Sequence, residues 1–153
     1  MTTCLTLAAA SLVLLSTACS AGADGLTLAA LQEEPILDAT IAGLTAKRIT
    51  EERSGANPMV TQLMEVRGSW EAASVKLAKA VLAHGWTVES INCVGTGNDV
   101  IAKKQIEGQW VLLESGAGTR AAGIILRRDP SQQPPKSLKL DDRCPAALIA
   151  AVS

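Results

Sequence analysis

The first 23 residues carry no lysine, arginine, aspartate or glutamate, and this uncharged stretch decides how much of the chain is left to fold. Its apolar core runs from Leu5 to Leu15 and is followed by small and polar residues as far as Ser20. That core is too short to span a bilayer, which requires roughly 20 apolar residues. A short apolar core before small residues is typical of a secretory signal, which is removed from the mature protein. We therefore expect an exported protein in which roughly 130 residues form one domain.

The end of this stretch, Leu15-Ser-Thr-Ala-Cys19, resembles the lipobox of bacterial lipoproteins. In that family a small residue precedes a cysteine, the thiol receives a diacylglyceryl group, and a dedicated peptidase cuts just before the cysteine. The resemblance implies that residues 1–18 are a signal peptide, that Cys19 is the lipid attachment site, and that residues 19–25 are a tether. It also implies a cell-envelope protein, lipid-anchored to the membrane on the exported side.

Ordinary secretion is the alternative, because Ala21-Gly-Ala23 forms a small-x-small cleavage site. A cut after Ala23 would discard Cys19 and release a soluble protein. The difference matters because one acyl chain holds a protein only weakly to a membrane, whereas two hold it stably. The two readings therefore predict a membrane-held protein and a freely secreted one.

Two of the four cysteines remain for the folded domain. Cys4 leaves with the signal, and Cys19 leaves with it or takes lipid. Cys93 and Cys144 are then an even pair in an oxidising compartment, so we expect a disulfide between them. It would close a long loop, for which the chain-entropy model gives about 4 kcal/mol of stabilisation at most. No metal site or cofactor is predicted, because the cysteine and histidine spacings of metal sites are missing from the sequence.

The first half of the mature chain reads as helical. Residues 26–50 suggest one or two short helices, and residues 50–57 suggest a polar loop. Asn57-Pro58 is a helix-start signal. From there to His84, apolar residues recur at spacings of three and four, and Gly85 follows at the usual position of a helix end. Gly68-Ser69 could divide this long helix into two.

The second half reads as strands. Alternation predicts strands over 86–93, 100–106, 109–113 and 122–128, with a bulge near Glu89-Ser90 and a hairpin turn at Glu107-Gly108. The proline-rich residues 129–135 suggest an extended connection, and Ala146–Val152 a short final helix. The fold class predicted from these elements is α+β: one long helix packed on a four-stranded antiparallel sheet, with short flanking helices, in a single domain over residues 26–153.

Candidate chemical groups are few. His84 is the only histidine, and its place in a last helical turn favours a capping role. The Gly-x-Gly of residues 95–97 is flanked by strands, which favours a turn over a phosphate-binding loop. The carboxylates outside the helices could in principle supply an acid–base pair of the glycosidase type, but no spacing rule selects two of them: they are Asp99, Glu107, Glu114, Asp141 and Asp142. The sequence therefore predicts no catalytic residues.

These observations favour a non-catalytic binding or scaffolding module at a membrane surface. Its expected partners are the membrane, through the lipid anchor, and an envelope protein or a small ligand. A nucleic-acid partner is not expected, because the chain is close to neutral and has no basic segment. The alternative from another class is a secreted soluble hydrolase or hydrolase inhibitor.

Overall fold

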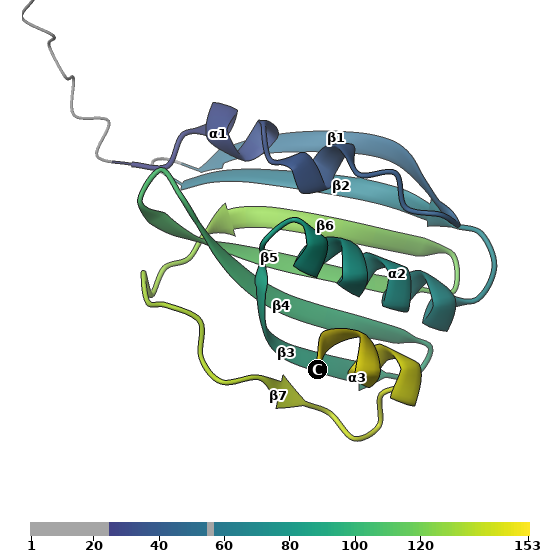
Figure 1. Ribbon diagram of the computed structural model, residues 1–153. Helices are drawn as coiled ribbons and strands as arrows, with labels where there is room; N and C mark the ends of the chain where they lie inside the picture. The colour runs from purple at the N-terminus through teal and green to yellow at the C-terminus, as the bar shows by residue number, and fades with distance from the viewer. Residues whose placement is uncertain (1–24, 55–56) are drawn as a thin grey trace, which may run out of the picture.

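The computed structural model describes residues 25–54 and 57–153, and its central feature is one seven-stranded sheet. The strands lie in the order β1-β2-β6-β5-β4-β3-β7 (Figure 1). All neighbours are antiparallel except β7, which runs parallel to β3. The strands are β1 (Leu44–Ser54), β2 (Asn57–Val66), β3 (Thr87–Val94), β4 (Gly97–Ile106), β5 (Gln109–Gly118), β6 (Ala121–Arg128) and β7 (Lys139–Leu140).

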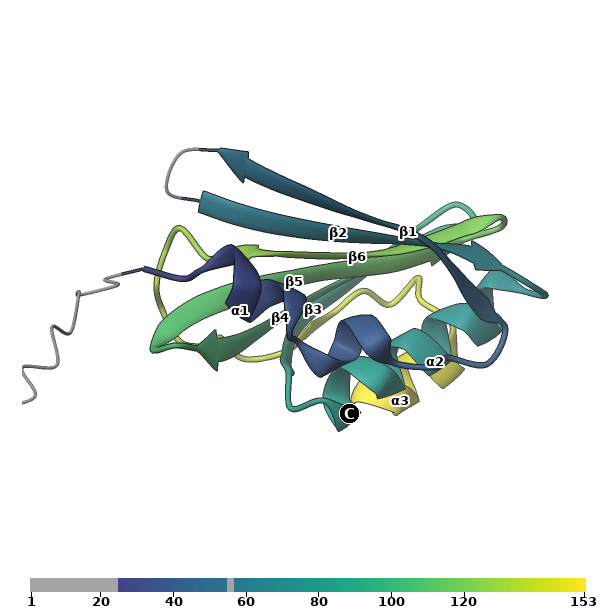
Figure 2. The same ribbon diagram turned by 90° about the horizontal axis from the view of Figure 1, so that it is seen from above.

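The helices of the described chain cover one face of this sheet (Figure 2). They are α1 (Leu28–Gln32), the 3-10 helix η1 (Pro35–Asp38), α2 (Trp70–Ala83) and α3 (Ala146–Val152). α2 packs on β3, β4 and β5, and α3 packs on α2. Buried apolar side chains from the helices and from the facing side of the sheet form one core. We call the other side of the sheet, away from the helices, the open face.

The predicted fold class is wrong, and the largest error lies in residues 57–66. They form strand β2 rather than the first half of a long helix. Within β2, every second residue from Pro58 to Val66 is buried, which is the period of a strand facing a core on one side. Gly68 has a φ of 104° and separates β2 from α2, so the helix proper begins only after the Ser69 cap. The helix is therefore 14 residues long.

The sheet is also larger than the four strands predicted. Residues 44–54, expected as helix and loop, form β1, which pairs with β2. β2 in turn pairs with β6, so the hairpin of β1 and β2 extends the sheet beyond the predicted meander. The sequence signal was weak here because β1 is an edge strand, where one side of the backbone has no strand partner among the described residues and side chains are largely polar.

The meander of β3, β4, β5 and β6 follows the predicted strands, and its two irregular points are confirmed. The register of β3 against β4 shifts between Val88 and Ser90, where the alternation slips. Glu107 and Gly108 have φ values of 49° and 75°, as a tight two-residue hairpin turn requires. β5 is longer than the strand predicted over 109–113, because it continues to Gly118.

The C-terminal part is attached to β3. Cys93 and Cys144 form the expected disulfide. The backbone N–H of Cys93 also donates to a carboxylate oxygen of Asp141 at 3.2 Å. The predicted final helix is confirmed as α3, which begins directly after Pro145. A disulfide is compatible with an exported protein. None of the helices in residues 25–54 and 57–153 has the length and apolar character needed to cross a membrane.

Candidate ligand-binding site on the open sheet face

The centre of the open face is made of glycine and alanine. Gly116 of β5 lies between Asp99 of β4 and Gly123 of β6, and Gly123 lies opposite Leu63 of β2. Two residues farther along the same strands, Gly97 of β4 pairs with Gly118 of β5, and Ala121 begins β6 beside them. We call this set the glycine floor: Gly97, Gly116, Gly118, Ala121 and Gly123.

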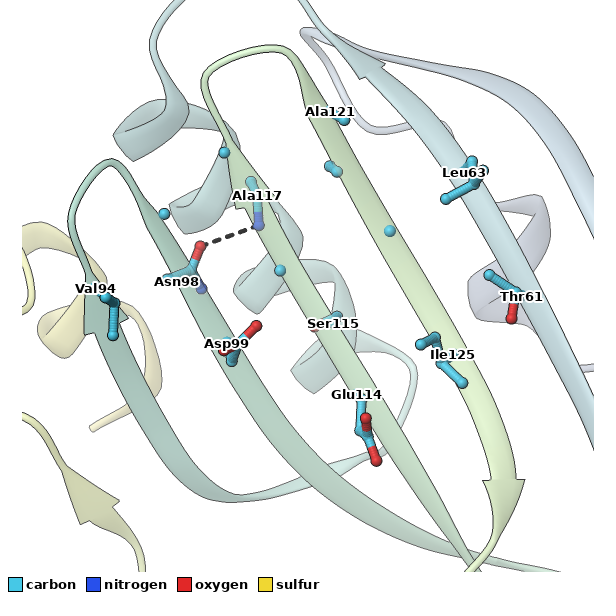
Figure 3. A pocket seen from close by; sticks show the side chains of 15 residues that line it. Thr61, Leu63, Val94, Asn98, Asp99, Glu114, Ser115, Ala117, Ala121 and Ile125 are labelled. Atoms are coloured by element: carbon cyan, nitrogen blue, oxygen red, sulfur yellow. Dashed lines mark hydrogen bonds between the residues drawn. The ribbon is translucent and has the colours of Figure 1, made fainter.

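Larger side chains surround the glycine floor, so the open face is hollowed there. The hollow has a volume of about 470 Å³ and is open to solvent. Figure 3 views it with the helices behind the sheet, and shows the labelled side chains of the rim on the strands around it. The rim residues include Thr61 and Leu63 of β2, Val94 of β3, Asp99 of β4, Glu114 of β5 and Ile125 of β6.

The backbone at Gly116 leaves no space for a side chain. A β-carbon there would overlap the backbone carbonyl oxygen of Asn98 and would lie 3.2 Å from the Asp99 carboxylate. By contrast, a β-carbon at Gly118 would meet nothing closer than 3.7 Å. Glycine within a strand often marks the close approach of another group. At Gly116 that group is the neighbouring strand.

Asn98 supports the floor from the helix side. Its side-chain oxygen accepts hydrogen bonds from the Ser74 hydroxyl of α2 and, at 3.2 Å, from the backbone N–H of Ala117. Its side-chain nitrogen is buried without a hydrogen-bond partner in the described part of the chain. The hydrogen bonds of Asn98 therefore join α2 to β4 and β5 at the end of the sheet that carries the hollow.

The carboxylates near the hollow differ in their partners. The Arg127 side chain donates to Glu114, with Nε 3.0 Å from the carboxylate oxygen. Glu65, farther along β2, pairs with Lys47 of β1 at 2.6 Å. That hydrogen bond holds the pKa of Glu65 below its usual value. Asp99 is exposed and forms no ion pair within residues 25–54 and 57–153. It is therefore the carboxylate on the rim whose charge is not balanced by a neighbour.

The opposite end of the open face is covered by residues 129–137, which we call the strap. Lys103 of β4 lies beneath it, with Nζ 2.7 Å from Asp129, 3.4 Å from Glu89 and 3.3 Å from the Gln133 carbonyl oxygen. Both Lys103 and Asp129 are buried. The strap thus covers the open face over this end of β3, β4 and β5, and the hollow lies outside the part that it covers.

In this cluster, ion pairing shifts the pKa values of Lys103 and Asp129 more than burial does. Burial alone would lower the pKa of Lys103, but the hydrogen bond and charge of Asp129, with those of Glu89, raise it above its ordinary value. Burial likewise opposes the charged form of Asp129, yet the hydrogen bonds from Lys103 and Ser131 lower its pKa. Both groups are therefore charged at neutral pH. No local sequence pattern indicates this buried ion pair, because Lys103 and Asp129 lie far apart in the sequence.

Cys93, Cys144 and His84 do not line the hollow. Cys19, the predicted lipid attachment site, lies outside the described residues, as do the signal peptide of residues 1–18 and most of the tether of residues 19–25. Cys93 and Cys144 staple β3 to the start of α3. His84 is the C-cap of α2, where its backbone N–H donates to Ala80 and Leu82.

The carboxylates considered from the sequence are scattered, except for two. Asp99 and Glu114 both line the hollow. Glu107 accepts hydrogen bonds from Thr27 at the other end of the sheet. Asp141 is held by the Arg143 side chain, and the hydrogen bonds from that side chain and from the backbone N–H groups of Arg143 and Cys93 lower its pKa. Among the described residues, no cluster of three or more histidine, cysteine or acidic side chains is placed to hold a metal ion.

Sequence reasoning missed the glycine floor. The strand predicted over 109–113 ends before Gly116 and Gly118. Their spacing of two was the available signal, because it places both on the same face of a strand. Gly97 and Gly123 could not be joined to them without the register of the strands.

Comparison with known proteins assigns no relationship: no protein-family model, curated protein or solved structure matches this chain.

Proposed function

We propose that this chain is a bacterial cell-envelope lipoprotein, held at the exported face of a membrane through a diacylated Cys19, and that it acts as a non-catalytic binding module. The hollow on the open face is its ligand site. The anchor rests on the lipobox-like segment that ends at Cys19. The Cys93–Cys144 disulfide supports an oxidising compartment.

The single observation that carries the binding role is the hollow itself. Helices cover one face of the sheet, and the strap covers one end of β3, β4 and β5 on the other, yet the open face is lowered at the glycine floor. A volume of about 470 Å³ lies within the range of small-molecule sites. The strands beneath it are fixed by the core and by the Asn98 network, so the hollow exists before any ligand binds.

Hydrolysis is less well supported than binding. A glycosidase-type mechanism requires two carboxyl groups that both face the substrate. Of the two carboxylates on the rim, Glu114 is engaged by Arg127. His84 serves as the end of α2 and does not line the hollow.

The anchor is tested by the intact mass of the protein extracted from the membrane fraction of a bacterial cell that produces it. We expect a chain that begins at Cys19 and carries acyl mass, with two hydrogens missing for the disulfide. Cys19→Ala is the control and should yield no acylated product. A mass that begins at Asp24 would show ordinary secretion, and an unprocessed chain with free thiols would overturn export altogether.

A further inference from the structure

We propose that the hollow binds small organic ammonium ions. The cationic nitrogen pairs with Asp99, and a slim apolar body lies over Gly116 and Gly123 against Leu63. This inference rests on the proposed function, because it names the ligand class of the same site.

Charge gives the first argument. The lining of the hollow contains the two acidic residues Asp99 and Glu114 but no lysine, arginine or histidine. Arg127 compensates Glu114 from β6, so one negative charge is left at Asp99. An anionic ligand would meet this charge without a compensating cation on the rim. A cationic ligand would form the one ion pair that the rim lacks.

Shape gives the second argument. Asp99 and Leu63 stand at opposite ends of one row across β4, β5, β6 and β2. Between them lie only Gly116 and Gly123, so no third side chain stands in the row. The two end side chains lean towards these glycines, because a β-carbon at Gly116 would lie 3.2 Å from Asp99 Oδ1 and one at Gly123 would lie 3.8 Å from Leu63 Cδ2. Three strand spacings of about 4.8 Å separate the ends. A ligand with a nitrogen at one end and an apolar group a few bonds away matches this row.

Exposed apolar side chains give the third argument. Leu63 is 47% exposed and Val94 is 71% exposed, and both stand on the rim. A bound apolar group would remove part of this surface from water, which is favourable. The strap covers the other end of β3, β4 and β5, so the site is bounded on that side. Its volume of about 470 Å³ suits a small molecule.

The test is an NMR titration of the purified full chain with 2-phenylethylammonium, followed through the backbone amides of the glycine floor. The neutral probe 2-phenylethanol has the same apolar body without the charge. We expect saturable shifts at Gly116, Gly118 and Gly123 with the ammonium, and roughly threefold to fivefold weaker binding of the alcohol, as suits one exposed ion pair. Raising the salt concentration should narrow that difference.

Variants separate the charge from the hollow. Asp99→Asn should lower the affinity for 2-phenylethylammonium to that for 2-phenylethanol. Asp142→Asn removes an exposed carboxylate elsewhere and should leave the affinity for the ammonium unchanged. Gly123→Val should abolish binding of both probes, because its side chain would occupy the floor of the hollow. We expect the variant to fold, since a β-carbon at 123 would lie 3.4 Å from the Gln62 carbonyl oxygen and can be accommodated. Cooperative thermal unfolding of each variant verifies that it is folded.

The outcomes distinguish the two levels of the proposal. Equal binding of ammonium and alcohol, or an unchanged affinity in Asp99→Asn, would overturn the ammonium preference and leave the binding role standing. If neither probe shifts the amide signals of the glycine floor, the ammonium inference is overturned. If both probes still cause these shifts in Gly123→Val, the hollow is not the binding site of either probe.

Discussion

The absence of a side chain at position 116 is what lets the two central strands approach each other beneath the hollow. A β-carbon there would overlap the Asn98 carbonyl oxygen, which belongs to a rigid backbone and cannot move aside easily. Glycine is thus required at this position by the sheet, while the same glycine also keeps the floor low.

We predict that Gly116→Ala lowers the free energy of unfolding by about 1–3 kcal/mol, because the overlap must be relieved by displacing a strand. Gly118→Ala is the matched control two residues away, where the nearest atom to a new β-carbon is 3.7 Å distant. It should change the stability by no more than about 0.5 kcal/mol or raise it. Urea unfolding monitors both variants, and equal losses would contradict the assignment.

At the scale of single residues, the sequence could identify groups whose role is local. His84 at a helix end and the Cys93–Cys144 pair belong to this kind, because helix-end signals and cysteine counts need little knowledge of the fold. The hollow could not be found in that way. Its members come from β2, β3, β4, β5 and β6, and only the strand register brings Asp99, Gly116, Gly123 and Leu63 into one row.

The same limit applies to Lys103 and Lys104, which are adjacent in β4. Lys103 is buried beneath the strap, and Lys104 pairs with Glu34 at 3.0 Å. Their partners are distant in sequence, so no local pattern could reveal them.

At the scale of elements, β2 shows why periodicity alone can mislead. Residues 58–66 bury Pro58, Val60, Gln62, Met64 and Val66, but Gln62 is polar and interrupts the apolar alternation. Its side-chain N–H donates to the Leu37 carbonyl oxygen at 2.6 Å, which satisfies the buried amide. A polar residue with a distant partner thus concealed the period of two, and the spacing of the remaining apolar residues then resembled a helix.

The C-terminal elements depend on the disulfide. β7 is two residues long and α3 seven, so neither holds the chain end strongly by itself. The bond joins residues 51 apart in the sequence. We predict that reduction lowers the free energy of unfolding by up to about 4 kcal/mol, since the unfolded chain regains the entropy of the open loop.

Urea midpoints with and without dithiothreitol measure this effect. The double variant Cys93→Ser/Cys144→Ser should resemble the reduced protein and should not respond to dithiothreitol. A reductant effect that persisted in the double variant would assign the stabilisation to another group.

At the scale of the whole molecule, the two ends of the sheet are different. The chain enters beside the turn between β4 and β5, where the Thr27 N–H donates to Glu107 at 3.3 Å. The hollow lies at the other end of the same strands, next to Gly97 and Gly118. β5 spans the distance from Gln109 to Gly118, which is about 30 Å at roughly 3.4 Å per residue.

If Cys19 carries the proposed acyl groups, we expect the Glu107 end to lie nearer the membrane than the hollow, because Thr27 lies at that end. We predict that a gadolinium-chelating lipid in a nanodisc broadens the backbone amide signal of Gly108 more than those of Gly97 and Gly118. The same protein without the chelated metal is the control. Stronger broadening at Gly97 would reverse the orientation.

In the expected orientation, distance from the membrane would set the electrical surroundings of Asp99. The potential of an anionic headgroup layer decays over about 8–10 Å at physiological ionic strength, which is much less than the length of β5. A cation that reaches Asp99 would then do so at the concentration of the surrounding fluid, without the enrichment that acidic lipids create at their surface. Occupancy of the hollow would then report what is dissolved outside the cell membrane, whatever lipids the membrane contains.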